Sequence, residues 1–107
     1  MATKNKCNRE LEDLERVFKA VAHRARRHIL IVLQARGGRM TAGEIVKRFS
    51  CSWPTTTRHL RVLQFGGLVA VEKQGRESFY VLNSKRLKSV MGGWLSWFEK
   101  KKGENDE

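Results

Sequence analysis

Apolar residues recur at steps of three and four along most of the chain, as they do in amphipathic helices. This period predicts a first helix over residues 9–22 and a second over residues 23–36. Paired glycines follow the second segment at positions 37 and 38, and glycine is the usual residue just past a helix C-terminus. The first third of the chain is therefore expected to form two helices.

Two shorter helices are predicted next, separated by a turn of three residues. Thr41 and Glu44 have the spacing of a capping box, which predicts a helix within residues 40–49. Ser52 is suited to cap a following helix over residues 53–65, and a proline is tolerated in its first turn because the N–H groups there have no helical partner. A short turn between two small helices is typical of a helix-turn-helix.

The hydrophobic period changes to two after residue 67, which indicates β-strands. Residues 68–73 and 78–83 are β-prone, and Gly75 lies in the turn between them. Ser84 then has the position of an N-cap for a last helix, from residue 85 to about residue 100. The predicted fold is thus mainly α with a small β-hairpin, the arrangement of a winged helix-turn-helix.

A chain of 107 residues has the size of one domain and buries only a modest core. We expect this domain to span residues 9–100, with a flexible N-terminus at residues 1–8 and a disordered charged tail at residues 101–107. No apolar run approaches the ~20 residues that a membrane span requires, and the polar N-terminus lacks the apolar core of a signal peptide. The predicted location is therefore the cytoplasm, with no membrane partner.

Charge gives the first indication of function. Lysine and arginine total 22 against 11 acidic residues, so the formal net charge is +11. An excess of this size within structured segments favours an acidic polymer as partner, and double-stranded DNA suits the predicted fold. The two cysteines, Cys7 and Cys51, lack C-x-x-C spacing, so neither a disulfide scaffold nor a zinc finger is predicted.

Four stretches of the sequence carry a resemblance to a known family. They are "VFKAVAHRARRHILIVL", "MTAGEIVKRF", "SWPTTTRHLRVLQFGGLV" and "GRESFYVLN". In order and spacing they resemble the ArsR-type winged helix-turn-helix repressors of bacteria, over about residues 15–100. The resemblance implies a homodimer that binds a palindromic operator and represses transcription.

Many members of this family release DNA when a metal ion binds, but this sequence departs from their ligand pattern. Metal-sensing members carry a cysteine-rich segment in the third helix, where residues 43–47 of this chain include no thiolate or imidazole. Others use acidic and histidine ligands on the last helix, and no histidine follows His59 here. We therefore expect a repressor with no metal site and no cofactor.

The fourth helix is predicted to lie in the major groove of DNA. Its stripe of Thr56, Leu60 and Leu63 would face the core, which leaves the opposite face for DNA. Arg58 or Arg61 can bind guanine bidentately, and the tip of the hairpin can reach phosphates or the minor groove. The predicted DNA-binding residues are Thr41, Ser52, Trp53, Thr55, Thr57, Arg58, Arg61, Lys73 and Arg76.

Three features of this surface leave alternatives open. Trp53 can contact thymine methyl groups and sugars or fold onto the third helix; relatives often carry glutamine there, so the base preference is expected to differ. His59 is expected to pack or hydrogen-bond beside the third helix, with a phosphate contact as the alternative. Arg24, Arg26 and Arg27 can approach phosphates or form a solvated, ion-paired helix face.

The first and last helices are predicted to form a dimer interface. A monomer of this size has too little core to bury all of their apolar residues, so symmetric pairing would cover the rest. The alternative is that the aromatic side chains close the core of a monomer. The predicted interface residues are Leu11, Leu14, Phe18, Val90, Met91, Trp94, Trp97 and Phe98.

Two other functions remain as alternatives. Cys51 lies beside the predicted recognition helix, whose N-terminus and arginines favour a reactive thiolate, so a thiol-redox-responsive repressor is one of them. A winged helix that binds a protein through its aromatic-rich last helix, and not DNA, is the other. No enzyme is expected, because the sequence offers no nucleophile–base pair, glycine-rich phosphate loop or cofactor motif.

Overall fold

The computed structural model describes the backbone of residues 2–99 and the side chains of residues 8–99. The predicted tail at residues 101–107 therefore lies outside the described residues. The described chain is mainly helical with a small antiparallel sheet, as predicted. Its elements are α1 (Ala2–Val21), α2 (Arg24–Ala35), β1 (Arg39–Thr41), α3 (Ala42–Arg48), α4 (Trp53–Phe65), β2 (Val69–Gln74), β3 (Glu77–Leu82), α5 (Ser84–Leu95) and the 3-10 turn η1 (Ser96–Phe98).

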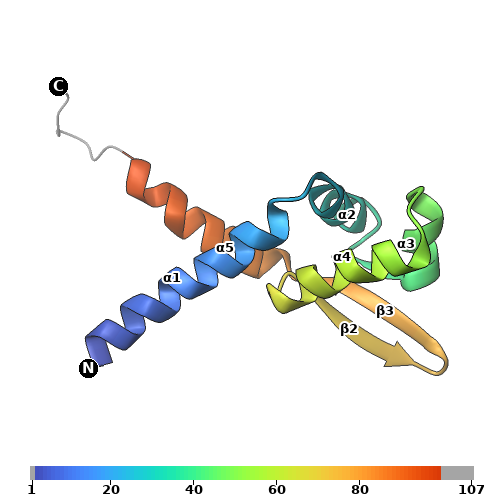
Figure 1. Ribbon diagram of the computed structural model, residues 1–107, viewed down its shortest axis with the longest axis horizontal. Coiled ribbons are helices and arrows are strands. Elements are labelled where there is room, and N and C mark those ends of the chain that lie inside the picture. Colours follow the sequence, from blue (N-terminus) through green and yellow to red (C-terminus); the bar gives the residue numbers. More distant parts are fainter. Residues whose placement is uncertain (1, 100–107) are drawn as a thin grey trace.

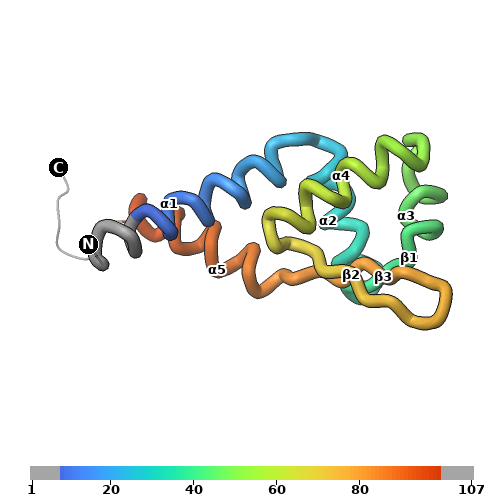
Figure 2. Tube along the Cα trace, turned by 60° about the horizontal axis from the view of Figure 1, so that its bottom comes forward, coloured from blue at the N-terminus to red at the C-terminus, as the bar shows by residue number. Residues whose placement is uncertain are grey.

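The elements form two parts, as Figure 1 shows. Helices α1 and α5 contact each other and extend together to one side of the molecule. Helices α2, α3 and α4 gather with the sheet on the other side, and the β2–β3 hairpin projects from this group. Figure 2 shows the same separation after rotation. The helix-turn-helix and its wing thus lie at the opposite end from the α1–α5 arm.

Strand β1 is an element that periodicity did not predict. It is three residues long and pairs antiparallel with β3, with Met40 opposite Tyr80, so the sheet order is β1-β3-β2. A strand this short has no alternation that sequence reasoning can detect, and its partner lies about 40 positions further along the chain. The strand fixes the start of α3 against the base of the wing.

The hairpin turn is centred on Gly75 as predicted, but it consists of two residues and not of the four that the sequence left between the strands. Gln74 pairs with Glu77, so Gly75 and Arg76 form the turn. Gly75 has a φ of +62°, whereas Arg76 has no positive φ. A glycine with positive φ at the first of two turn residues is the pattern of a type II′ turn, which suits the twist of a hairpin. The wing is therefore a tight ribbon that carries Arg76 at its tip.

The core lies where α1, α2, α3 and α4 meet the sheet. The predicted stripe of α4 is confirmed, because Thr56, Leu60 and Leu63 are all buried. Burial of this face turns the opposite face of α4 toward solvent. The buried apolar residues are Val17, Ala20, Ile29, Leu30, Val32, Leu33, Met40, Ile45, Leu60, Leu63, Leu68 and Val69.

Thr56 is only 2% exposed, and its hydroxyl has no hydrogen-bond partner among the described residues. Valine has nearly the same shape but no polar atom to desolvate, so Thr56→Val is expected to raise the free energy of unfolding by about 1–2 kcal/mol. Urea denaturation would measure the change. Thr57→Val, at the half-buried neighbour, is the matched control and should give no such gain. A less stable Thr56→Val protein would contradict the prediction.

Helix boundaries differ from the prediction at both ends of the chain. Helix α1 begins at Ala2 and not at residue 9, so the segment expected to be flexible continues that helix. Asn83, not Ser84, caps α5, because its side-chain oxygen accepts a hydrogen bond from the Arg86 N–H at 3.1 Å. Adjacent cap-forming residues made this position ambiguous in the sequence.

No helix among residues 2–99 is long and apolar enough to cross a membrane.

Helix α5 ends at Leu95, short of the predicted residue 100. Gly92 and Gly93 lower the helix propensity of its last turn. The Ser96 hydroxyl donates a hydrogen bond to the Gly93 carbonyl at 2.7 Å, and the chain tightens there into η1. The aromatic residues at the end of the arm are therefore held on a 3-10 turn.

Candidate nucleic-acid interface

The N-terminus of α3 is capped as predicted. The Thr41 hydroxyl accepts a hydrogen bond from the Glu44 N–H at 3.1 Å, and the Glu44 carboxylate accepts one from the Thr41 N–H at 2.8 Å. This backbone hydrogen bond lowers the pKa of Glu44. Because the Thr41 N–H and hydroxyl oxygen are both used by the cap, its hydroxyl hydrogen is the donor left for a phosphate.

The N-terminus of α4 is also closed by its own residues. The Ser52 hydroxyl accepts a hydrogen bond from the Thr55 N–H at 3.3 Å and donates one to the Thr55 hydroxyl at 3.1 Å. Ser52 is therefore the predicted cap. The contact satisfies one backbone N–H of the first turn of α4 and so fixes where that helix begins.

The outer face of α4 carries three large side chains at the predicted positions. Trp53 stands at the first residue of the helix and is 55% exposed, which favours contact with a partner over folding onto α3. Arg58 and Arg61 are exposed, and neither forms an ion pair with another described residue. Guanidinium groups without protein partners keep all their donors for base edges or phosphates.

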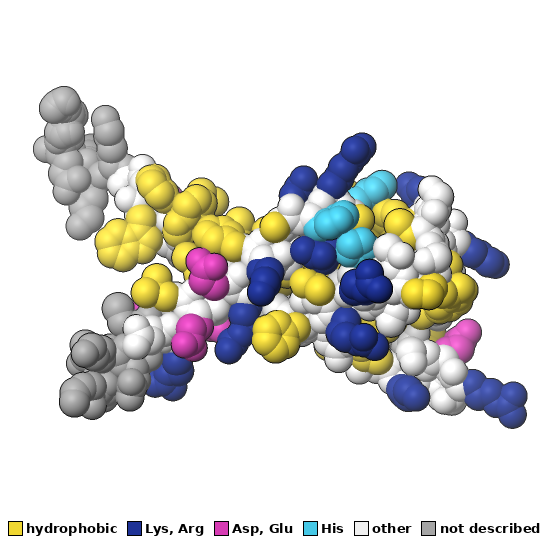
Figure 3. Space-filling view, viewed as in Figure 1, with side chains coloured by type: hydrophobic (Ala, Val, Ile, Leu, Met, Phe, Trp, Pro, Cys, Tyr) yellow, Lys and Arg dark blue, Asp and Glu magenta, His cyan; other side chains and the backbone are white. Residues whose placement is uncertain are grey.

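The wing adds two further cations. Lys73 and Arg76 are exposed at and beside the tip of the hairpin. Its base is braced by Arg39, whose guanidinium lies 3.8 Å from the centre of the Phe79 ring and whose Nε is 3.7 Å from a Glu72 carboxylate oxygen. Figure 3 shows Lys and Arg side chains over the α2, α4 and hairpin half of the molecule. The predicted DNA-binding cations thus share the end that holds the helix-turn-helix.

Two of the three arginines at the start of α2 bind the end of α1, a role that the sequence did not suggest. Arg26 donates to the Ala20 carbonyl at 2.8 Å and to the Lys19 carbonyl at 3.0 Å. Arg27 donates to the Val21 carbonyl at 2.8 Å. The last carbonyls of a helix lack α-helical partners, although that of Lys19 also accepts from the Ala22 N–H at 3.3 Å, so the guanidinium groups cap the negative end of α1. Both arginines therefore stabilise the junction of α1 and α2, a role that neither of the two stated alternatives included.

His59 connects this cap to the recognition helix. It is buried on the inner face of α4 with its ring centre 4.5 Å from that of His23, and its Nδ1 lies 3.3 Å from Nη1 of Arg26. Since arginine can only donate, Nδ1 accepts and the neutral ring carries its proton on Nε2. His59 thus contacts the start of α2, a neighbour that the sequence did not predict.

The stability of the domain is expected to fall as the pH decreases below about 6.5, the ordinary pKa of histidine. Burial, with the nearby charges of His23, Arg26 and Arg58, lowers the pKa of His59 in the folded state. The unfolded chain therefore binds this proton at a higher pH than the folded one, and protonation favours unfolding. Melting temperatures between pH 8 and pH 5 would measure the effect. His59→Gln should flatten this dependence, whereas His28→Gln, at an exposed histidine, should keep it.

Aromatic side chains of α1, α5 and η1 form a cluster on the arm. Trp94 packs edge-on against Phe18 at 5.0 Å and against Phe98 at 5.1 Å between ring centres. The cluster remains open, because Trp97 is 83% and Phe98 68% exposed; Leu11 of α1 is also 59% exposed. Figure 3 shows hydrophobic side chains gathered on this arm. The monomer core therefore leaves Leu11, Trp97 and Phe98 uncovered, whereas Val90 and Met91 are half-buried against it and Leu14 is half-buried.

The described residues do not form a metal centre. No group of three histidine, cysteine, aspartate or glutamate side chains within residues 8–99 could hold a metal ion. Helix α3 offers no thiolate or imidazole at residues 43–47. Cys51 is a free, half-buried cysteine in the turn before α4, and the side chain of Cys7 lies outside the description.

Comparison with known proteins identifies the family. A family described as a helix-turn-helix domain matches residues 21–72. The transcriptional repressor SdpR of Bacillus subtilis is 34% identical over 93 residues, which cover 87% of this chain and 99% of SdpR. An ArsR-like transcriptional regulator from Rhodococcus sp. RHA1 is 28% identical and superposes with a TM-score of 0.72 over 82% of this chain and 81% of its own. The chain belongs to the ArsR family of transcriptional repressors.

A further ArsR-type structure agrees in fold. It is the homodimeric winged helix-turn-helix DNA-binding domain Mb0332 from Mycobacterium bovis, which is 22% identical with a TM-score of 0.67 over 91% of this chain and 89% of its own. The fold of this ArsR-family chain is thus a winged helix-turn-helix, in which α3 and α4 form the helix-turn-helix and β2–β3 is the wing. Relatives of this kind are transcriptional regulators and not enzymes.

Proposed function

We propose that this ArsR-family repressor acts in the cytoplasm as a homodimer that binds a palindromic operator, with no metal or cofactor. The observation that carries the proposal is the outer face of α4, where Trp53, Arg58 and Arg61 project to solvent beside a basic wing. One α4 enters the major groove of each half-site, and its arginines read base edges. Bound in this way, the dimer prevents transcription by occupying the promoter.

The wing and the helix caps supply affinity without sequence information. Lys73 and Arg76 contact phosphates or the minor groove, and Thr41, Ser52, Thr55 and Thr57 contact phosphates at the ends of α3 and α4. The net charge of +11 supports this division, because cations that neutralise phosphates release counterions from DNA.

The open aromatic cluster on the arm supports the homodimer. Trp97 and Phe98 are exposed on a surface that α1 and α5 build together, and a two-fold axis there would bury both copies of the surface. The M. bovis domain of the same fold is a homodimer. A dimer would place the two recognition helices on successive major grooves, ~34–36 Å apart.

Selection of duplexes from a random-sequence library, followed by a gel shift at several salt concentrations, tests the proposal. The expected result is an enriched pseudo-palindrome whose affinity falls steeply with salt, about 10³–10⁵-fold between 50 and 200 mM for 6–10 phosphate contacts. Light scattering of the free protein should give the mass of two chains. Absent or salt-insensitive binding would refute the function. A monomer that ignores DNA would support the protein-binding alternative.

Replacement of Trp53 by glutamine is expected to change the base preference and leave stability nearly unchanged. The indole is more than half exposed at the leading end of α4, so little packing is lost. Glutamine can donate to and accept from adenine, whereas an indole offers apolar contact to thymine methyl groups. Library selection with both proteins would compare the preferred bases. An unchanged consensus together with a lower melting temperature would assign Trp53 to packing instead.

The thiol-redox alternative has a separate test. Cys51 precedes α4 by two residues, so its oxidation could move the cap at Ser52. A Cys51→Ser protein that keeps both its DNA affinity and the wild-type response to peroxide would exclude Cys51 as a switch. The proposed repressor needs no such response.

A further inference from the structure

We infer that Arg86 is a positioning residue that fixes the recognition helix to the α1–α5 arm, and so sets the distance between the two recognition helices of the dimer. The inference rests on the proposed function, since it needs a dimer that binds two half-sites. Arg86 lies in the first turn of α5 and does not face DNA itself. It acts through the carbonyl of Gly66, the residue that ends α4.

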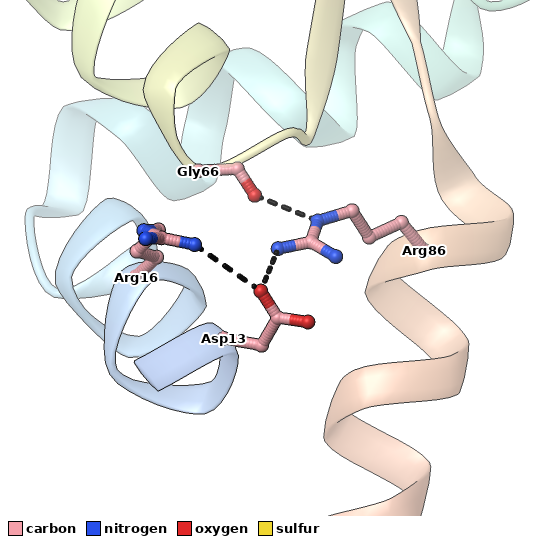
Figure 4. A network of polar contacts seen from close by, with 4 residues as sticks. All are labelled: Asp13, Arg16, Gly66 and Arg86. Carbon is pink, nitrogen blue, oxygen red and sulfur yellow. Dashed lines mark hydrogen bonds and ion pairs between the residues drawn. The ribbon is translucent and has the colours of Figure 1, made fainter. Parts of the chain in front are cut away.

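One guanidinium group joins three helices (Figure 4). Arg86 Nε donates to the Gly66 carbonyl at 2.8 Å, and Nη2 donates to the Asp13 carboxylate of α1 at 3.3 Å. Of the ion pairs between described residues, the Arg86–Asp13 pair is the one that joins two helices. A planar guanidinium can hold both partners at a fixed angle, which the point charge of a lysine cannot do.

The space around this contact fits the guanidinium. A Cβ at Gly67, where φ is +79°, would lie 2.5 Å from Arg86 Nε. A Cβ at Gly66 would lie 3.1 Å from the Ala20 Cβ and 3.2 Å from the Arg16 carbonyl oxygen of α1. A side chain at Gly67 would therefore be strained and would displace the guanidinium, and one at Gly66 would be crowded against α1. The C-terminal end of α4 is held between α1 on one side and Arg86 on the other.

This end of the recognition helix controls where the other end points. Trp53 lies at the far end of a helix of 13 residues, about 20 Å long, so a tilt of about 5° at Gly66 moves that end by roughly 2 Å. In the proposed dimer both copies tilt, and the change in separation is doubled. Because half-sites lie at a spacing set by the turn of DNA, such a change decides which operator fits.

If the Arg86–Asp13 contact only stabilised the fold, its loss would lower the melting temperature and leave the angle between the helices unchanged. Asp13 is about half exposed, so its ion pair is screened by solvent and contributes little to stability. What the contact specifies is the geometry between helices. The measurement must therefore report on geometry, and not on melting temperature alone.

Spin labels on the full chain measure this geometry. The protein carries Cys7→Ser, Cys51→Ser and Gln64→Cys, which labels an exposed position near the Gly66 end of α4 once per protomer. A second labelled protein carries Thr57→Cys in place of Gln64→Cys, which puts the label nearer the N-terminal end of α4. Double electron–electron resonance then gives the distance between the two copies. The expected result is one narrow distance distribution in the wild-type background and a broader or shifted one in Arg86→Met and in Asp13→Asn, with the larger change at position 57.

Two further variants separate positioning from charge. Arg9→Gln removes a positive charge from an exposed position of α1 that forms no ion pair with another described residue, and should leave the distribution narrow. Arg86→Lys keeps the positive charge but lacks the planar guanidinium that can bind two partners at once. Its distance distribution should therefore lie between those of the wild type and Arg86→Met. Unchanged distributions in both Arg86→Met and Asp13→Asn would overturn the inference. Asp13→Asn, at a half-exposed site, keeps the test decisive if Arg86→Met does not fold.

The same variants change operator choice. The probes are duplexes selected by the wild-type protein and resynthesised with their half-sites one base pair closer or farther apart. Wild type and Arg9→Gln should discriminate against both altered spacings, whereas Arg86→Met and Asp13→Asn should lose about 5–10-fold of that discrimination. A uniform loss of affinity at every spacing would overturn the inference. A wild-type protein that shows no distance between copies would refute the dimer itself, which is a separate result.

Discussion

Replacement of both Arg58 and Arg61 by alanine is expected to weaken binding to the selected operator by roughly 30- to 25,000-fold. One of the two arginines is expected to bind guanine bidentately, a contact that contributes about 1–3 kcal/mol, and a dimer loses this contact twice, which amounts to about 2–6 kcal/mol. Both side chains are exposed without ion-pair partners among the described residues, so the fold should be unaffected. Fluorescence anisotropy at fixed salt, with circular dichroism for folding, measures both effects.

The matched control for this prediction is Arg9→Ala. Arg9 is an exposed arginine of α1 on the arm, so its loss removes the same charge at a distance from α4. The control should change affinity little. An equal loss in the control would mean that net charge alone determines binding. A loss for the α4 variant that is the same on random and selected duplexes would assign the arginines to phosphates and not to bases.

Local sequence patterns predicted the part of the site that local chemistry determines. The capping box of Thr41 and Glu44, the Ser52 cap and the buried stripe of α4 each depend on residues within a few positions of one another. These features fix the axis and the exposed face of the recognition helix. The choice of Trp53, Arg58 and Arg61 as its outer residues follows from period alone.

Contacts between segments that are distant in the sequence could not be predicted from local sequence patterns. Arginines in the first turn of α2 are unfavourable for that helix's own dipole, which is a sign that they have another partner, but the carbonyls at the end of α1 are not identified by it. The same limit applies to Arg86, whose partners Asp13 and Gly66 lie 73 and 20 positions away. Strand β1 and the contact of His59 with Arg26 also depend on the folded arrangement. The positions of cations that hold helices together therefore had to come from the structure.

Substitution of aspartate for Trp97 is expected to convert the protein to a monomer that still folds. The indole is 83% exposed in a single chain, so a charge there costs the monomer little, whereas a two-fold interface would bury two carboxylates against apolar side chains. Loss of a buried tryptophan from each protomer should raise the dimer dissociation constant by at least about 1,000-fold. Analytical ultracentrifugation over a range of concentrations measures that constant.

Ile31→Asp provides the matched control for the arm, because Ile31 is 65% exposed on α2, far from η1 in sequence, and equally apolar. It should remain a dimer with full operator affinity.

Trp97→Asp should bind a full palindrome no better than an isolated half-site, since one recognition helix then acts alone and the second half-site no longer contributes. A Trp97→Asp protein that stays dimeric would move the interface away from the aromatic cluster. If wild type and Trp97→Asp were both monomeric and both bound DNA equally, the exposed tryptophan would serve another partner, and the palindrome would have to be read by monomers that meet only on the operator.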